Sequence, residues 1–240
     1  MEDMITKLYH CTSFECLKSI LASQAFYPSY CLEKAEYLRN KQDFAFAMVC
    51  FADLYFEELP LHMEKFKYSC YLKMSKEWAM RNGLAPIIYY TKKNCPLSAC
   101  LGNIIDQTLE EIAEGKTDTP FVKSVNVLLS FLKQYEGQYW MDGKEDWSEN
   151  TQFYTEREWR YIPLVQNGEA YYLEPEQFKN MAFRKQKRDE LIQHGYILRF
   201  SIDDVLEIGV SNQQELDNLH KFFEEQGFSS NWYAKIKIIS

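Results

Sequence analysis

Apolar runs recur along the chain and predict the strands of a sheet. Residues 44–51 are almost continuously apolar, which is typical of a central strand covered on both faces. Shorter runs of strand type are bounded by polar or turn-forming residues. Together these patterns predict strands at 7–10, 44–51, 68–74, 86–90, 151–164, 196–200 and 234–239.

Apolar residues spaced three and four apart predict helices between these strands. Phe14, Leu17 and Leu21 would form the buried face of the first helix, with Thr12 as its N-cap and Glu15 completing a capping box. Ser75 would cap a short helix that ends at 82–83. The later helices are predicted at 175–194 and 212–225, whereas the polar stretch 137–150 predicts a surface loop.

Residues 96–135 have a different pattern, which predicts an inserted helical hairpin. Two amphipathic stretches flank the polar loop 115–120. They should form antiparallel helices packed through Leu101, Ile105, Leu128 and Leu132. With 240 residues and 46% hydrophobic composition, the chain can bury one large core. We therefore expect a single α+β domain spanning 1–240, with a mixed or antiparallel sheet and an insertion at 96–135.

Charge and cysteine usage narrow the functional classes. The formal net charge of −8 disfavours broad nucleic-acid binding, and the basic run 184–188 is interpreted as a solvated helix face. Seven cysteines without a CxxC pair, and four separated histidines, favour free thiols in a reducing compartment over a zinc site. An acidic start and the lack of a membrane-length apolar run predict a cytoplasmic protein without a membrane association.

The segment 154–161 carries the most informative polar pattern. In a strand, Glu156, Glu158 and Arg160 would share one face, because successive side chains alternate. One interpretation is an exposed strand with ion pairs. The other is a cleft wall in which Arg160 orients Glu158 as a hydrogen-bond acceptor or general base. The spacing leaves both open.

Two further positions are candidates for a site. His10 ends the first predicted strand just before a helix, where ligands and anions often bind, although a structural histidine fits as well. Cys11 is adjacent to it, but neighbouring strand residues point to opposite faces, which argues against a thiol nucleophile activated by His10. Asp53 follows the central apolar strand and could be either a site residue or a helix cap. The standard nucleotide, metalloprotease and esterase motifs do not occur.

Four stretches together resemble the AbiGi-type abortive phage-infection proteins. They are residues 9–15 (YHCTSFE), 48–53 (MVCFAD), 74–84 (MSKEWAMRNGL) and 153–161 (FYTEREWRY). Proteins of this kind are antitoxins of a two-gene bacterial defence system. The resemblance therefore implies a phage-defence role and a cognate toxin as protein partner.

More loosely, residues 9–12 resemble the first motif of ADP-ribosyl transferases. That resemblance implies a split sheet surrounded by helices, and NAD or a related nucleotide as ligand. His10, Glu158 and Arg160 would then be the catalytic candidates. The residues expected to contact the nucleotide are Tyr9, Thr12, Asp53 and Glu156. The antitoxin hypothesis comes first, followed by a NAD-using enzyme and a nucleotide-binding sensor without turnover.

Overall fold

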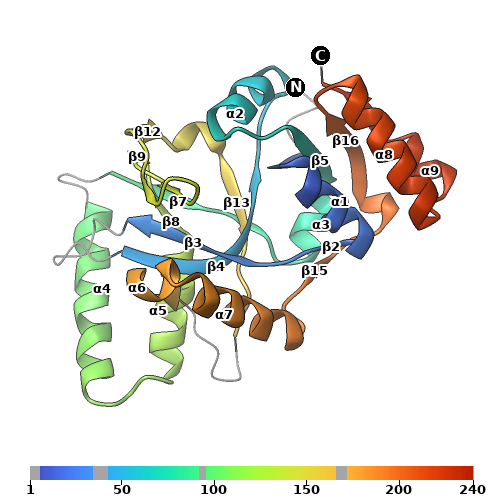
Figure 1. Cartoon of the computed structure of the whole chain (residues 1–240). Coiled ribbons are helices and arrows are strands. Elements are labelled where there is room, and N and C mark those ends of the chain that lie inside the picture. The colour runs from blue at the N-terminus through green and yellow to red at the C-terminus, as the bar shows by residue number, and fades with distance from the viewer. Residues whose placement is uncertain (1–5, 35–42, 92–95, 166–171, 240) are drawn as a thin grey trace.

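A mixed sheet forms the centre of the molecule (Figure 1). The computed structural model describes residues 6–34, 43–91, 96–165 and 172–239. The strands of the sheet are β1 (Lys7–Thr12), β3 (Ser29–Lys34), β4 (Asp43–Ala52), β5 (Cys70–Ser75), β6 (Ala85–Pro86), β13 (Glu158–Tyr161), β14 (Tyr172–Leu173), β16 (Val205–Val210) and β17 (Ile236–Ile238). Their order is β17-β16-β5-β1-β4-β13-β6, and β3 and β14 also pair with β4. Only β16 and β17 run parallel among these pairs of described strands. The α+β class is confirmed.

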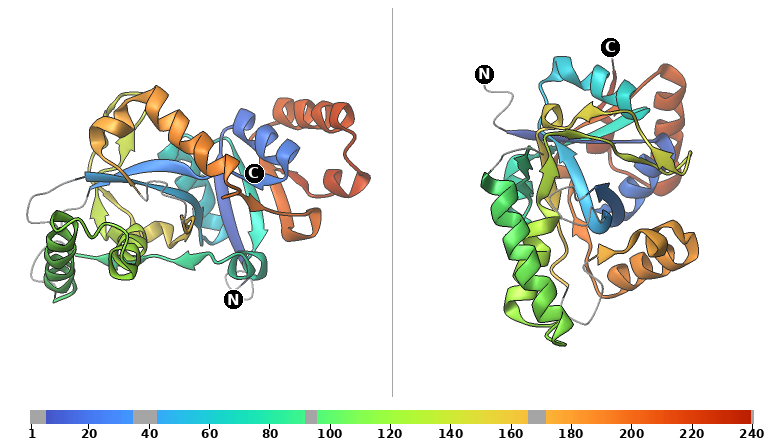
Figure 2. Two further views of the ribbon diagram at one scale, coloured as in Figure 1. Left: turned by 90° about the horizontal axis from the view of Figure 1, so that it is seen from below. Right: turned by 90° about the vertical axis from the view of Figure 1, so that its left-hand side faces the viewer.

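Helices cover both faces of this sheet. They are α1 (Phe14–Ser23), α2 (Leu59–Phe66), α3 (Lys76–Arg81), α4 (Pro96–Ala113), α5 (Pro120–Ser130), α6 (Pro175–Lys179), α7 (Met181–Gln193), α8 (Gln213–Gln226) and α9 (Ser230–Tyr233). Around β4, α4 and α5 lie on one face and α6 and α7 on the other (Figure 2). Alternation along β4 explains this: Phe46 and Met48 pack toward α4 and α5, whereas Ala45 and Ala47 pack toward α6 and α7. Within the described ranges, none of the helices is both long and apolar enough to cross a membrane.

Strand β4 brings the two candidate segments together. Tyr9 of β1 and Glu158 of β13 both lie opposite Ala52, one from each neighbouring strand. The strands that carry His10 and Glu158 therefore belong to the same sheet. Directly opposed residues of an antiparallel pair point to the same face. Tyr9 and Glu158 thus share one face, and His10 points to the other.

The helical hairpin is confirmed in its helices but not in its last contact residue. Helices α4 and α5 pack side by side, with Leu101 and Ile105 buried between them and the sheet (Figure 1). Leu132 was predicted to lie on the second helix of the hairpin. It lies instead on β8 (Leu132–Gln134), a strand that pairs in parallel with β7 (Ile88–Tyr90). Leu129 is buried where Leu128 was expected to pack, while Leu128 is half-buried.

Three predicted elements are interrupted, each for a local reason. The strand expected at 151–164 breaks into β12 (Thr151–Gln152), a 3-10 turn (Tyr154–Glu156) and β13, because Arg157 has a left-handed backbone with φ of 43°. The helix expected at 175–194 divides at Asn180, whose side chain accepts from the Phe183 amide and starts α7. The strand expected at 86–90 divides into β6 and β7, since Ile87 donates to Glu158 O instead of continuing one ladder.

The predicted surface loop at 137–150 contains short strands. These are β9 (Glu136–Gly137), β10 (Trp140–Met141) and β11 (Asp146–Trp147), of which β10 and β11 form a hairpin. Trp140 and Trp147 pack against the core under α6 and α7. The predicted strand at 196–200 shortens to β15 (Leu198–Arg199), which pairs with β2 (Ala25–Phe26).

Candidate functional site

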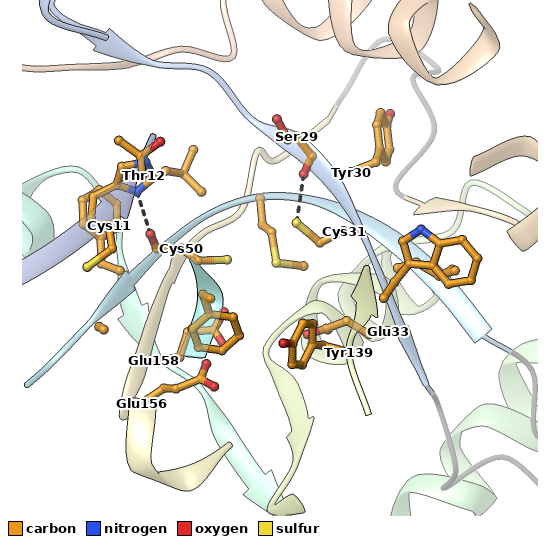
Figure 3. A pocket seen from close by; sticks show the side chains of 18 of the residues that line it. Cys11, Thr12, Ser29, Tyr30, Cys31, Glu33, Cys50, Tyr139, Glu156 and Glu158 are labelled. Atoms are coloured by element: carbon orange, nitrogen blue, oxygen red, sulfur yellow. Dashed lines mark hydrogen bonds between the residues drawn. The ribbon is translucent and has the colours of Figure 1, made fainter. Parts of the chain in front are cut away.

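A cavity of about 570 Å³ opens beside β4, where β1 and β3 approach it. Five of the seven residues predicted for the site line it: Tyr9, His10, Thr12, Glu156 and Glu158. Figure 3 shows Thr12 and Cys11 on one side of β4, and Glu156 and Glu158 on another. Arg160 and Asp53 do not line the cavity. The structure thus gathers most of the predicted residues, from strands far apart in the sequence.

Glu158 is held by two cations at once. Arg160 Nε donates to Glu158 Oε1 at 2.7 Å, and Lys133 Nζ donates to Oε2 at 2.6 Å. Arg160, which is 0% exposed, also donates to Glu33 and to the Ser130 carbonyl. The predicted contact between Arg160 and Glu158 therefore exists, although Arg160 lies behind the carboxylate and not in the cavity.

The charges in this cluster are balanced. Three carboxylates face three cations: Glu33, Glu156 and Glu158 against Lys65, Lys133 and Arg160. Glu156 joins the cluster through two lysines, since its Oε1 lies 3.1 Å from Lys65 Nζ and its Oε2 lies 3.5 Å from Lys133 Nζ. Burial alone would raise the pKa of the Glu158 carboxyl. The charges of Arg160 and Lys133, with their hydrogen bonds, outweigh burial and hold its pKa well below the usual range. Glu158 is consequently an ionised acceptor and a weak base at neutral pH.

His10 is engaged in the sheet itself. Its Nδ1 lies 2.9 Å from the Cys50 carbonyl oxygen, and because a carbonyl can only accept, Nδ1 must carry the proton. The ring packs against Phe26 and Phe51, with centroids at 4.8 and 5.3 Å. Burial lowers the pKa of His10, and the hydrogen bond to Cys50 offsets that only in part. A neutral, hydrogen-bonded His10 is accounted for by packing, on the face of the sheet opposite to Glu158.

Thr12 does not cap the first helix. Pairing of β1 with β5 continues through Thr12, which lies opposite Cys70, so the strand is longer than predicted. The N-cap of α1 is Ser13, whose Oγ accepts from the Cys16 amide at 3.4 Å. The predicted cap and capping box at Thr12 and Glu15 are wrong by one position. Thr12 remains available as a cavity residue.

Asp53 ties the end of β4 to its neighbours. Its Oδ2 accepts from Lys76 Nζ at 2.6 Å, and its carbonyl accepts from Arg157 Nε at 2.6 Å. Its amide donates to the Glu156 carbonyl at 3.2 Å. These contacts fix the left-handed turn that positions β13. Asp53 therefore supports the site from outside the cavity and caps no helix, since the N-cap of the following 3-10 turn is Tyr55.

Several charged residues of the site were not predicted, among them Lys133, Glu33 and Arg188. Lys133 and Glu33 lie on β8 and β3, which the sequence pattern did not separate from neighbouring segments. Arg188 belongs to the basic run that was expected to be solvated, yet it is half-buried and lines the cavity. Its Nε is buried and has no hydrogen-bond partner among the described residues. The other basic residues of this run form ion pairs near the surface: Arg184 with Asp142, Lys185 with Asp189, and Lys187 with Glu190.

The cysteines and acidic residues give no second kind of chemistry. Cys11 lines the cavity, but burial raises the pKa of its thiol to about 12, so it is a poor nucleophile at neutral pH. Six cysteines in the described part of the chain are free. Across that same part, no three His, Cys, Asp or Glu side chains are grouped so that they could hold a metal ion.

Comparison with known proteins identifies the family. A family profile described as abortive phage resistance protein AbiGi, antitoxin, matches residues 24–211, which is well over half of the chain. The chain therefore belongs to the AbiGi family of abortive phage resistance proteins. An abortive phage resistance protein AbiGi from Lactococcus lactis subsp. cremoris is 24% identical over 228 residues, covering 84% of this chain and 88% of that protein. No solved structure matches the chain.

Proposed function

We propose that this chain acts as an antitoxin in the bacterial cytoplasm, by binding a cognate toxin protein and not by turnover of a substrate. The family assignment supports a role in abortive phage resistance. Binding is favoured over catalysis because Glu158, the strongest catalytic candidate, is already engaged in hydrogen bonds within the chain. Both oxygens of Glu158 accept hydrogen bonds from cations of the same chain, the buried Arg160 and the half-buried Lys133.

That double contact of Glu158 is the observation that carries the proposal. A general base must be able to take a proton near neutral pH, and the neighbouring Arg160 and Lys133 oppose protonation. A balanced buried cluster instead makes a rigid scaffold, in which each charge is compensated. A rigid scaffold suits a protein that presents a fixed surface to a partner, because less conformational entropy is lost on binding.

Co-expression tests this proposal directly. The chain should be produced together with the product of the adjacent gene of its two-gene system, and growth and co-purification measured. We expect the second protein to arrest growth alone, growth to recover when this chain is present, and the two to co-elute. Persistent growth arrest with no complex would contradict the antitoxin function.

A nucleotide such as NAD is the second candidate ligand, within a split sheet of the ADP-ribosyltransferase-like kind. The observation in its favour is that Tyr9, His10, Thr12 and Glu156 converge on the cavity with Glu158. Against turnover stand the engaged Glu158 and the placement of His10 on the other face of the sheet. Incubation with NAD should release no nicotinamide; release that Glu158→Gln abolishes would establish the enzyme instead.

A further inference from the structure

The charged side chains that line the cavity leave an excess of positive charge. Each of the four lining carboxylates has a cation of the same chain within ion-pair distance: Glu33 with Arg160, Glu156 with Lys65 and Lys133, Glu158 with Arg160 and Lys133, and Asp142 with Arg184. The lining cations are Lys34, Lys133 and Arg188. Of these, Lys34 and Arg188 have no carboxylate partner among the described residues. Two positive charges on the cavity wall therefore remain uncompensated.

Arg188 has lost hydration without gaining a partner in the described ranges of the chain. Its side chain is half-buried, and its Nε is shielded from solvent and has no hydrogen-bond partner there. A guanidinium is a permanent cation with five N–H donors, and its partial burial without a partner costs free energy. An anion bound at the accessible N–H groups of Arg188 would offset that cost.

Arg188 and Lys34 lie on the same face of the sheet. Arg188 precedes Leu191 by three residues on α7, so the two residues share one face of that helix. Leu191 packs with Tyr30 and Leu32 of β3. Because side chains alternate along a strand, Lys34 points to the same face as Tyr30 and Leu32. Helix α7 and strand β3 therefore bring both cations to one side of the cavity.

Lys34 is held in place by neutral groups. Its Nζ donates to Gln138 Oε1 at 2.6 Å, and Gln138 Nε2 donates in turn to the Ser148 carbonyl at 2.8 Å. The same Nζ lies 4.6 Å from the centre of the Trp147 ring. These contacts orient the ammonium group of Lys34 but bring no negative charge to it.

Aromatic rings line the cavity beside these cations. Tyr139 and Trp140 follow Gln138 directly, and both are half-buried. Trp140 packs near Phe178 with ring centroids 6.3 Å apart, in the same cluster as Tyr30. Faces of aromatic side chains stack on flat ligand rings. The cavity volume of about 570 Å³ lies within the range of small-molecule sites.

We propose that the cavity binds a small phosphate monoester that carries a flat ring, with Arg188 and Lys34 as its anion-binding residues. A phosphate monoester carries about two negative charges at neutral pH, which matches the two uncompensated cations. The guanidinium of Arg188 donates to phosphate oxygens, and the ring stacks on the aromatic wall. This site goes beyond the antitoxin function and does not rest on it. It also differs from the NAD candidate in the residues that hold the ligand.

Isothermal titration calorimetry of the purified full chain tests the proposal with defined probes. The probes are the nucleoside monophosphates AMP, GMP, CMP and UMP, each compared with the nucleoside that lacks the phosphate. We expect at least one monophosphate to bind with a Kd below about 1 mM, and its nucleoside to bind at least about tenfold more weakly. Equal affinities within every pair, or no binding by any monophosphate, would overturn the proposal.

Substitution of Arg188 shows whether the phosphate lies at the proposed residues. Arg188→Gln should weaken binding of the monophosphate at least about tenfold and leave the affinity for its nucleoside unchanged, because only the phosphate contact is lost. The matched control is Arg199→Gln, which removes an exposed arginine of β15 that lies outside the cavity. It should change the affinity less than about twofold. Equal losses in the two variants would show that net charge and not this site governs binding.

A second variant keeps the test independent of the folding of the first. Thermal unfolding without ligand checks that Arg188→Gln is folded. Lys34→Gln removes the other cation from a different element and should also weaken the monophosphate more than its nucleoside. Unchanged monophosphate affinity in a folded Arg188→Gln or Lys34→Gln would contradict the assignment of that residue. The co-expression test of the antitoxin function needs no ligand, so the two proposals fail separately.

Discussion

At the scale of single residues, the pair Glu158 and Arg160 shows what spacing can and cannot predict. Residues two apart in a strand share a face, so their contact followed from the sequence and is found at 2.7 Å. Their third partner, Lys133, comes from a strand that the pattern merged into a helix. Without it, Glu158 could be interpreted as a free base. Its role therefore depended on a long-range contact that no local pattern encodes.

The same cluster predicts how stability depends on pH. The pKa of folded Glu158 lies below its unfolded value of about 4.3, so its stabilisation is complete above that pH and is lost as pH falls toward the folded pKa. Glu158→Gln removes the charge and leaves Arg160 and Lys133 under-compensated. At pH 7 it should lower the free energy of unfolding by about 3 kcal/mol.

Urea denaturation of both proteins between pH 3 and pH 7 measures this difference. The gap between wild type and Glu158→Gln should narrow below about pH 4, because the unfolded wild type then takes up a proton at Glu158 that the folded protein, with its lowered pKa, does not bind. Glu110→Gln, an exposed change on α4, serves as the control and should cost less than about 0.5 kcal/mol. A gap that stays constant down to pH 3 would show that the Glu158 charge does not stabilise the fold.

At the scale of elements, strong periodicity and caps were predictive and weak patterns were not. The short helix α3 begins after Ser75 and ends at Asn82, as its cap and turn residues predicted. Strand β3 was missed because it is short and runs into a charged segment without a turn signal. Strand β16 was missed as well; its Gly209 leaves room for the Tyr71 ring, a packing requirement that appears only in three dimensions.

The helical hairpin provides a matched test at this scale. Leu101 and Leu109 both lie on α4, but Leu101 is 2% exposed and Leu109 is 50% exposed. Leu101→Ala should lower the free energy of unfolding by about 2–5 kcal/mol, because it leaves a cavity between α4, α5 and the sheet. Leu109→Ala should cost less than about 1 kcal/mol, since little packing is lost. Equal losses in urea denaturation would contradict the described packing of α4.

At the scale of the whole molecule, the sheet is shared between segments that the sequence keeps far apart. Strand β4 pairs with β1, β3, β13 and β14. The register of each pair along β4 therefore decides which side chains of these strands lie near the cavity. The pattern of strands and helices predicted an α+β protein, whereas the shared sheet of His10 and Glu158 is seen only in the pairing of β1 and β13 with β4. Their opposite faces follow only from the register at Ala52, which sequence patterns do not fix.

Net charge gives the last prediction, which concerns how fast the toxin associates. A chain with a net charge of −8 and exposed carboxylates such as Glu145 and Glu149 should steer a basic surface of the toxin toward it. The association rate should then fall about tenfold as ionic strength rises from 50 to 500 mM, while the dissociation rate changes little, because salt screens long-range attraction more than close contacts. The double variant Glu145→Gln/Glu149→Gln should flatten this dependence.

The control Glu224→Gln/Glu225→Gln removes the same charge from α8, on the other side of the molecule from the β9 and β12 strands (Figure 1). Total charge is equal in the two variants, so only the position of the carboxylates differs between them. If both flatten the salt dependence equally, net charge and not the position of these carboxylates governs the encounter. If neither the wild type nor the variants respond to salt, electrostatic steering does not govern the association, and the prediction is wrong.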